Sequence, residues 1–500
     1  MREKDIKREV LKQLKKEFPK WRRLPRKEKQ RIAGEVLESV VAKNTGNEPT
    51  ADIPIHELTN TPVPMPGIIK LAEMEQFVEQ TTRSLLSFPV KRWPSRYEDP
   101  ELEAIDRLVD DRVVNRLLAP VGYTPSMRDL YPSHYLRAEL LKSLRYAEIS
   151  YRKYCRDVIN RMDSKRQRAF IHLPLHRAIT IDHTQLSRFR NSLTVVQLVN
   201  LMVYVIHLLV KSGRITHPFR VCGIDSTDVA VLSCPRPLAT IEVGNKKVRI
   251  YAELEADCGK RRKKRDKSEY FVGYRIHTLV AIDPNTGLNH PLFSLAAPAN
   301  HHDNLFLPQL IGFGHAMGLS MDIVTVDEGY IDTEQNEQIR KDYGVTIITP
   351  AKEKALIPDH VDPNSGAVYL NGHCEVPMSY GGRTETGHEF HCGADECFHA
   401  PTCSKCREIP LDAGRFGQIQ DQVYGVEQAR DIRKNMERCF NLLKHREGLD
   451  PLRVKSQHST LVAATLAQMA TVVLEIVGTR KTETKKTLPK QLKMFCCQAA

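Results

Sequence analysis

The sequence predicts a mixed α/β domain with a central sheet, preceded by a helical region and interrupted by a cysteine-rich insertion. Residues 68–213 carry helical patterns almost throughout. From residue 218 the apolar period shortens to that of strands, and hairpin-connected strands are followed by helix, strand, helix and strand up to residue 349. Such an order is typical of helices packed against a mixed sheet. Residues 352–420 then break the pattern, because they are rich in Gly and loops and contain five of the twelve Cys.

Length and composition narrow the class of protein. A chain of 500 residues is long enough for about three domains. Its 41% hydrophobic and 27% charged residues exclude a wholly disordered chain, and its twelve Cys are too dispersed for a secreted disulfide scaffold. The 74 Lys and Arg exceed the 61 Asp and Glu, which gives a net charge of +13. A polyanionic partner is therefore expected, either nucleic acid or an acidic membrane surface.

Neither the first residues nor the apolar stretches predict an exported or membrane-spanning protein. The chain opens with charged residues where a signal peptide needs an apolar segment. Two stretches, 193–210 and 460–477, approach the length of a membrane span, but polar residues interrupt both. We therefore expect two core helices, no membrane partner and an intracellular protein.

Residues 1–60 are predicted to form a basic helical arm. Residues 1–45 contain 15 Lys and Arg against 7 Asp and Glu, and apolar stripes around Val10 and Val36 fit two short helices. Three Pro within residues 62–66 separate this arm from the helical region that begins at residue 68. The pattern fits either a solvated helical pair or an arm that contacts DNA.

Residues 68–213 are predicted to be a helical DNA-binding or assembly domain. Within it, Asp182 or Thr184 can cap a short helix that carries Arg188 and Arg190 beside an aromatic residue. Helical Arg residues in this setting suit phosphate contact, although taken alone such residues more often form an ordinary exposed face.

From residue 216 onward strands and helices alternate, and each has a local signal. Apolar runs bounded by turn residues predict the strands, and the period of the apolar residues predicts the helices. The expected strands are 219–233, 238–243, 247–252, 271–283, 290–297, 323–327 and 345–349. The expected helices are 302–317, 333–343, 424–444 and 460–477, so that the α/β domain comprises 216–351 and 421–480, followed by a basic tail at 481–500.

Three carboxylates lie where acids are unusual. Asp225 lies within an apolar strand, and Asp327 ends another. Glu437 lies between Arg433 and Lys444 on a predicted helix. At about 100° per residue these three helical residues fall within about 40° of one another, beside an apolar stripe. The helix can therefore pack on the sheet and direct Glu437 toward the two strand acids.

Converging carboxylates are typical of sites for Mg²⁺ or Mn²⁺, because hard cations take oxygen ligands and are often shared with phosphate. Two such ions can activate a nucleophile and stabilise the leaving oxygen of a phosphodiester. Arg433 and Lys444 would then neutralise phosphate charge. The alternative is that the three acids are unrelated and structural. For any single acid this alternative is favoured, but three acids in the order strand, strand and helix favour the metal site.

Several short motifs occur together in one order. The matching segments are Gly223-Ile-Asp-Ser-Thr227, Gly273-Tyr-Arg-Ile-His277, Pro298-Ala-Asn-His-His-Asp303, Val326-Asp-Glu-Gly-Tyr330 and the spacing of Arg433, Glu437 and Lys444. With them, the chain resembles the DDE transposases of prokaryotic insertion sequences, in the group with a Tyr-Arg-Glu-Lys helix signature. Segment 182–190 is also similar to the N-terminal domain of that family.

The resemblance implies a ribonuclease-H-like catalytic domain that cleaves transposon ends and joins them to target DNA by two-metal hydrolysis and transesterification. It implies Asp225, Asp327 and Glu437 as ligands of Mg²⁺ or Mn²⁺. It also implies double-stranded DNA as substrate, a homodimer in the DNA complex and a cytoplasmic, nucleoid-associated location. At the position of the signature Tyr this sequence has Arg430. This residue adds a cation to the same side of the helix, and we count it among the expected phosphate-binding residues.

The insertion at 352–420 is predicted to hold structural Zn²⁺. Cys392, Cys397, Cys403 and Cys406 offer four thiols within fifteen residues, and the last two have the spacing of a usual tetrahedral half-site. A loop-rich segment with few apolar residues needs a staple, and disulfides are not expected inside a cell. The alternative is a set of free thiols in a flexible loop.

A run of cations lies between two predicted strands of the sheet. Residues 260–267 include seven Lys and Arg in eight positions. Such a run is usually a solvated loop. Beside a nuclease-like site it is expected to contact the phosphates of DNA, and a solvated loop can also do so. The residues expected at phosphate are Lys260, Arg261, Arg262, Lys263, Lys264 and Arg265.

Two other functions fit the same motifs. One is a structure-specific nuclease on the same fold, which lacks strand transfer and is separated by a strand-transfer assay. The other is a catalytically silent, domesticated DNA-binding protein derived from a transposase, whose expected mark is loss of an acid. All three acids are present, so the sequence favours an active transposase.

Overall fold

The computed structural model describes most residues between Glu3 and Gly478. The described ranges are 3–44, 66–83, 99–119, 130–349, 360–410, 436–449 and 452–478, with short gaps in several of them. Predicted residues that lie outside the description are Lys263, Lys264, Arg265, Cys397, Arg430, Arg433, the tail at 481–500 and the side chains of Arg261 and Arg262.

The central sheet has six strands in the order β4-β5-β1-β7-β8, with β6 also paired to β5. β1 is antiparallel to β5, and β5 to β4 and β6, whereas β7 and β8 continue from β1 in parallel. The strands are β1 (Val221–Ala230), β4 (Asp257–Arg262), β5 (Ser268–Ile282), β6 (Asn289–Pro298), β7 (Ile323–Val326) and β8 (Thr346–Ile348). All but β4 were expected from the sequence, and their existence is confirmed with shifted ends.

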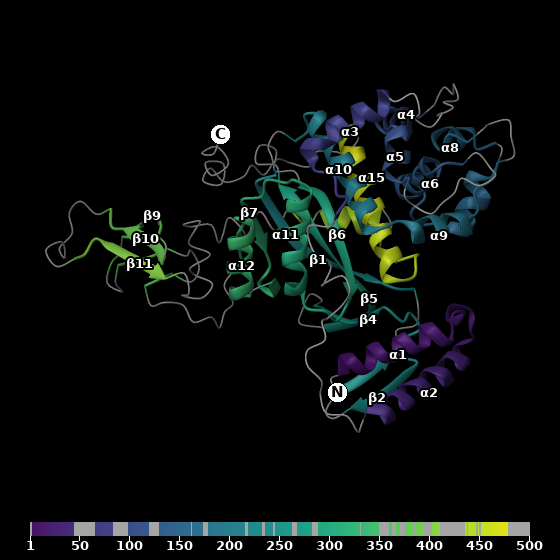
Figure 1. The fold of residues 1–500 in the computed structure, drawn as a ribbon, viewed down its shortest axis with the longest axis horizontal. Helices are drawn as coiled ribbons and strands as arrows, with labels where there is room; N and C mark the ends of the chain where they lie inside the picture. Colours follow the sequence, from purple (N-terminus) through teal and green to yellow (C-terminus); the bar gives the residue numbers. More distant parts are fainter. Residues whose placement is uncertain are drawn as a thin grey trace.

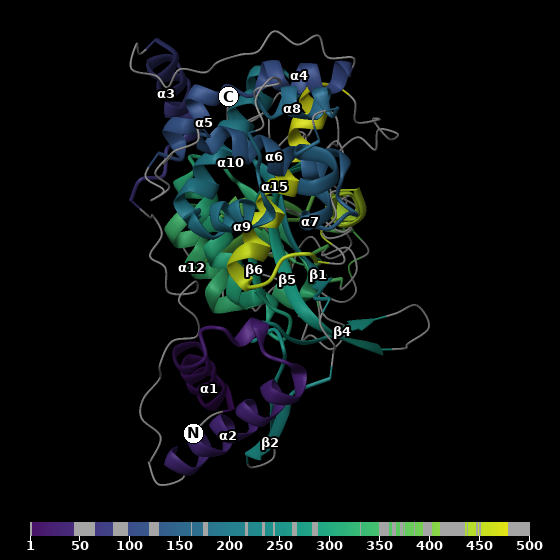
Figure 2. The ribbon, with the colours of Figure 1, turned by 90° about the vertical axis from the view of Figure 1, so that its right-hand side faces the viewer.

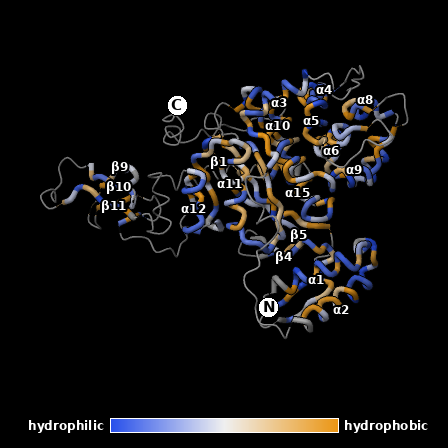
Figure 3. Tube along the Cα trace, viewed as in Figure 1, coloured by the Kyte–Doolittle hydropathy of each residue, from blue (hydrophilic) through white to orange (hydrophobic). Residues whose placement is uncertain are grey.

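Helices cover both faces of this sheet. α11 (Leu307–Ala316) and α12 (Thr333–Tyr343) lie on one side, and α15 (Gln457–Ile476) lies on the other (Figure 1). Figure 3 shows hydrophobic residues along α10 (Val195–Lys211) and α11, whereas α12 is largely hydrophilic. Among the described helices α15 alone has the length and composition of a membrane span, but 89% of its most apolar window is buried. The expectation of core helices in α10 and α15 is confirmed.

The helical region packs directly on α15 and shares one hydrophobic core with the sheet. Leu136 of α6, Leu201 of α10 and Leu466 of α15 belong to the same buried cluster as Ile224 of β1. The region comprises α3 (Leu71–Arg83), α4 (Pro100–Leu108), α5 (Asp111–Leu117), α6 (Pro132–Arg145), α7 (Tyr151–Tyr154), α8 (Lys165–Phe170), α9 (His183–Ser192) and α10. The boundary expected near residue 213 is therefore a change of secondary structure and not a change of core.

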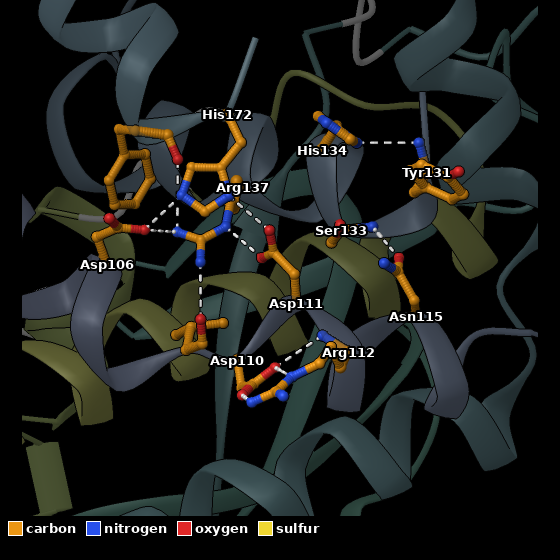
Figure 4. Close-up of polar contacts among 12 residues, drawn as sticks. Asp106, Asp110, Asp111, Arg112, Asn115, Tyr131, Ser133, His134, Arg137 and His172 are labelled. Atoms are coloured by element: carbon orange, nitrogen blue, oxygen red, sulfur yellow. Dashed lines mark hydrogen bonds and ion pairs between the residues drawn. The ribbon is translucent and has the colours of Figure 1, made fainter. Parts of the chain in front are cut away.

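A buried ion network ties these helices together (Figure 4). Arg137 donates to Asp111 at 2.6 Å, and its Nη1 lies 2.7 Å from Asp106. His172 bridges the same two carboxylates, at 2.5 Å from Asp111 and 2.7 Å from Asp106. Burial raises the pKa of Asp111, but the charge of Arg137 and the hydrogen bond from His172 outweigh it and hold this pKa well below its usual range.

The N-terminal helices do not form a free arm. α1 (Glu3–Glu17) and α2 (Arg26–Asn44) pack on a hairpin of β2 (Ala239–Val243) and β3 (Lys246–Ile250), and the four elements share a small apolar core. Figure 2 shows this unit at one end of the central sheet. The sequence predicts both helices and both strands, but their association joins segments far apart in the chain, which local patterns do not show.

The insertion contains a three-stranded antiparallel sheet where the sequence predicts mainly loops. Its strands are β9 (Ser379–Arg383), β10 (Gly387–His391) and β11 (Cys406–Pro410), with β10 in the middle. Phe390 and Ile409 belong to its small buried core. The strands are rich in Gly and polar residues, so the local signal is weak and cross-strand pairing determines the structure. For these residues the loop prediction was wrong.

Candidate active site

Asp225 and Asp327 lie on neighbouring parallel strands. The register of β1 and β7 places Ile224 opposite Val326, and the acids are the next residues of the chain, Asp225 within β1 and Asp327 directly after β7. Adjacent strands are about 4.8 Å apart, so the two acids occupy neighbouring positions. Because side chains alternate along strands, both acids lie on the face opposite to Ile224 and Val326. Both are half-buried.

The helical segment with Glu437 lies over this same face. A methyl group on Gly223 would clash with the sulfur of Met436 and come within 3.2 Å of the Thr325 side chain, so the Met436 side chain lies directly against Gly223. Gly223 precedes Asp225 by two residues and therefore faces the same way. Met436 is buried, and Glu437 beside it is exposed. The structure thus brings the backbone positions of all three predicted acids to one face and one region of the sheet.

The helix that carries Glu437 does not keep an α-helical winding as far as Lys444. Leu442–Arg446 form a π-helical turn, which winds more widely than an α-helix. A constant rotation of about 100° per residue therefore does not connect the two residues. The single narrow charged stripe was wrong at its Lys444 end, where the side chain is half-buried.

On the opposite face, Arg275 holds two further acids that were not assigned a role from the sequence. Its Nε lies 3.1 Å from Asp228 Oδ1, and its Nη1 lies 3.0 Å from Asp303 Oδ1. Arg275 and Asp228 are register partners on β5 and β1, which fixes their approach. Ser226 also donates to Asp303, at 3.4 Å. An arginine within an otherwise apolar strand was the available signal for this group.

A buried His–Tyr pair anchors the turn after Asp327. His277 Nδ1 lies 3.0 Å from the Tyr330 hydroxyl, and its ring stacks on Phe306 with centroids 4.2 Å apart. The Tyr330 amide donates to the Asp327 carbonyl at 3.0 Å and closes the turn. Burial, and then neighbouring positive charge, hold the pKa of His277 well below its ordinary value, so the imidazole is neutral. The pair therefore fixes the backbone at Asp327 without adding charge.

Burial, together with clustered carboxylates, determines the electrostatics of this site. Burial raises the pKa of Asp303; its arginine partner lowers it, but Asp228 and Asp327 raise it further, and the net pKa lies above its ordinary value. Burial also raises the pKa of Tyr330, and the charges of Asp303 and Asp225 add to that rise. The acids on both faces therefore act on one another. Such a set of oxygen donors suits a hard divalent cation.

The predicted phosphate-binding cations have different environments. Arg188 on α9 and Lys260 on β4 are exposed. Arg190, in contrast, is buried, forms an ion pair with Glu139 and lies 4.0 Å from the centroid of the Tyr151 ring. Its guanidinium is not available to phosphate, so the prediction for this residue was wrong. Its partner comes from another helix, and the local sequence does not reveal it.

The predicted zinc thiols do not all lie on one side of the insertion sheet. Cys392 packs with Phe390 against the small apolar core. Cys406 pairs across the strands with His391, and side chains alternate along a strand, so Cys406 lies on the opposite face. Cys403 is half-buried and accepts a hydrogen bond from the Lys405 amide at 3.4 Å. Of the described thiols, Cys392 and Cys406 therefore do not share one site, and Cys397 lies outside the described residues.

Comparison with known proteins identifies one domain. Residues 217–473, just over half of the chain, match the family described as a transposase DDE domain, and this range includes all three predicted acids. A solved structure of piggyBac transposase in a synaptic complex with hairpin DNA is similar at 12% sequence identity, over 80% of this chain and 83% of that chain, with a TM-score of 0.24. A TM-score this low identifies no fold. No curated protein sequence matches the chain.

Proposed function

The chain belongs to the family of transposases with a DDE domain and is a DNA transposase, and from this premise we propose that Asp225, Asp327 and Glu437 carry out its chemistry. The reaction is cleavage of transposon ends followed by their joining to target DNA. One observation carries the assignment: the strand register puts the two aspartates side by side, and Met436 packs the Glu437 segment over the same face.

The strand order supports a ribonuclease-H-like fold for this domain. The antiparallel strands β6, β5 and β1 are followed by the parallel strands β7 and β8. Numbered in chain order, these five strands read 3-2-1-4-5 across the sheet. This order places the strands of both aspartates at the centre, where neighbours on each side hold them in position. The Cys-rich insertion at 352–420 then separates β8 from the Glu437 helix.

Asp225, Asp327 and Glu437 would hold Mg²⁺ or Mn²⁺. All three offer carboxylate oxygens, which are the ligands that hard cations prefer. Burial is the main cause of the raised pKa of the neighbouring Asp303, and the negative charges of Asp228 and Asp327, which a cation would offset, add to it. When bound, such ions stabilise the attacking and leaving oxygens of a phosphodiester.

The remaining residues of the site position these groups. The hydrogen bond between His277 and Tyr330 fixes the turn that follows Asp327. The contact of Met436 with β1 sets how closely Glu437 approaches the sheet. Preorganisation of this kind matters because small displacements of a catalytic group cost large factors in rate.

Exposed cations would hold the DNA backbone. Figure 2 shows β4 and the start of β5 projecting beyond the sheet, and Lys260 is exposed on this ribbon. Neutral residues at 260–265 should weaken binding to all DNA sequences alike and flatten its salt dependence. The other proposed phosphate contacts are Arg188, Arg430, Arg433 and Lys444.

On the same premise we propose double-stranded transposon ends and target DNA as partners and a homodimer on DNA. We also propose a DNA-binding role for residues 68–213 and a nucleoid-associated, cytoplasmic location.

The direct test is cleavage of transposon-end DNA in Mg²⁺ by Asp225→Asn, Asp327→Asn and Glu437→Gln. Each carboxamide keeps the shape but loses the charge, so each should abolish cleavage and leave DNA binding largely intact. The matched control is Asp322→Asn, an exposed acid at the other end of β7, which should retain cleavage. Retained cleavage in one of the three variants would remove that residue from the site. Products joined to target DNA separate a transposase from a nuclease.

A further inference from the structure

A second group of metal-binding side chains lies in the insertion. Glu389 and His391 of β10 and Cys406 of β11 place one oxygen, one nitrogen and one sulfur within 4.8 Å of one another. We propose that these three residues bind Zn²⁺ and that the ion joins the two strands of the insertion sheet. This donor set differs from four cysteines, and it comes from strand pairing rather than from spacing along the chain.

The register of the sheet brings the three donors together. His391 lies directly opposite Cys406, and Glu389 precedes His391 by two residues, so all three share one face. Glu389 Oε1 lies 3.1 Å from Cys406 Sγ and 3.3 Å from His391 Nε2. Ligands of a tetrahedral Zn²⁺ lie about 3.4–3.7 Å from one another, so small side-chain rotations suffice.

The surroundings leave room for the ion. A side chain at Gly381 on the neighbouring strand would clash with the His391 ring, so the glycine keeps space for the imidazole. The side chains of His391 and Glu389 are 51% and 37% exposed, which allows an ion to enter from solvent. The site is therefore accessible, and its donors are not occupied by packing.

The mixture of donors selects the metal. Zn²⁺ takes sulfur, nitrogen and oxygen ligands in one site, whereas Mg²⁺ and Ca²⁺ require oxygen ligands. Three protein donors leave one position of a tetrahedron. We assign it to Cys403, which lies outside the group of three but has the sequence spacing of a usual zinc half-site with Cys406. Cys392 cannot share this site, because it packs against the apolar core on the other face.

The insertion also has a physical need for such an ion. Its described core is small and consists of the buried residues Val361, Val368, Met378, Phe390 and Ile409. A core of this size supplies little stability, and small units commonly add a metal that contributes binding energy to folding. An ion between β10 and β11 would hold the centre and the edge of the sheet together.

The test is the zinc content of the full-length protein, purified without a polyhistidine tag, incubated with Zn²⁺ and desalted. We expect about one Zn²⁺ per chain, because a structural site is nearly full. His391→Ala, Cys406→Ser and Cys403→Ser should lose most of it, whereas the control Cys392→Ser should keep it. Hydrogen exchange at 379–410 should rise in Cys406→Ser and remain unchanged in α11.

Two outcomes would overturn the proposal. One is wild-type protein with less than about half a Zn²⁺ per chain. The other is equal zinc loss in Cys392→Ser and Cys406→Ser, which would mean that the thiols and not the strand register define the site. Retained zinc in Cys403→Ser would overturn the assignment of that residue. Asp225→Asn should keep its zinc, and because no DNA is present, the result does not depend on the transposase reaction.

Discussion

Two clusters of buried charge in this molecule have similar compositions and opposite electrostatics. Both combine aspartates with one arginine and one histidine. In the helical region, Arg137 and His172 pair with two acids, and the pKa of Asp111 falls well below its usual range. At the central sheet the pKa of Asp303 rises instead, and His277 is held neutral.

The difference separates a cluster that stabilises the fold from one suited to bind a ligand. In the helical region cations face both carboxylates, so the cost of burial is compensated within the protein. At the sheet, burial and the neighbouring acids Asp228 and Asp327 outweigh the arginine beside Asp303. Negative charge concentrated at a site of this kind is typical of functional groups rather than of a structural ion pair.

The largest effect on stability is expected from Arg137→Ala. The Arg137 side chain is 2% exposed, and its removal leaves the buried Asp111 and the half-buried Asp106 without their arginine partner. Breaking a buried pair in this way costs about 3–5 kcal/mol of unfolding free energy. Urea denaturation followed by circular dichroism measures the loss. A change below about 1 kcal/mol, the range of exposed pairs, would show that the network is not structural.

Arg275→Gln should reduce DNA cleavage more than it reduces stability. The side chain is 21% exposed, so we expect a smaller stability loss of about 1–2 kcal/mol. Cleavage of transposon ends should fall about 10–100-fold, as is usual when residues around metal ligands are disturbed. Arg340→Gln, in an ion pair on α12, is the control and should retain cleavage. Full activity in Arg275→Gln would separate this arginine from the site.

The pH dependence of stability should come from the helical cluster. Burial lowers the pKa of His172, but the hydrogen bonds to Asp106 and Asp111 raise it by more. The net pKa therefore lies above the ordinary value of 6.5. A group whose pKa is raised by folding contributes its full stabilisation below its unfolded pKa, which is about 6.5 for histidine. This contribution is lost as the pH rises through the pKa of the folded state. The stabilisation that comes from the lowered pKa of Asp111 is present above about pH 3.8 and is lost only in stronger acid.

His172→Asn should therefore remove the decline in Tm that sets in as the pH rises above about 6.5. Asparagine is chosen because His172 has a φ of 63°, a left-handed conformation that Asn tolerates better than most residues. His183→Asn, at a half-buried residue outside this cluster, serves as the control and should keep the decline. An unchanged decline in His172→Asn would assign it to another group.

The smallest effect on stability is expected from the exposed Arg188 of α9, and the buried Arg190 of the same helix provides the contrast. Arg188→Ala should lower DNA affinity, reduce the slope of its salt dependence by about one and leave stability unchanged. Arg190→Ala should instead destabilise the protein, because Glu139 would remain buried without its partner. Salt-dependent binding and thermal unfolding of both variants measure this. Equal behaviour of the two would contradict the difference in burial.

Local patterns in the sequence predicted much of the fold and the three acids. α12 begins and ends where the apolar period indicates, because its signals lie within its own residues. Asp225 and Asp327 are recognisable because a charge within or directly after a buried strand is costly and therefore informative. Their neighbouring positions follow from two adjacent parallel strands.

Features that depend on distant partners could not be predicted. Arg190 pairs with Glu139 on another helix, and α1 packs on a hairpin from the middle of the chain. The pairing of His391 with Cys406 likewise depends on the register of strands that local propensity does not predict. In each case the deciding contact lies between elements, where a periodic pattern carries no information.

The central claim is that Asp225 and Asp327 hold a divalent cation, whereas the acids of the helical cluster do not. Fe²⁺ substituted at such a site cleaves the nearby backbone when ascorbate and peroxide are added. The account predicts cuts beside Asp225 and Asp327 that excess Mg²⁺ suppresses, and none beside Asp106 or Asp111. Cuts at the helical cluster, or their absence at the two strand acids, would contradict it.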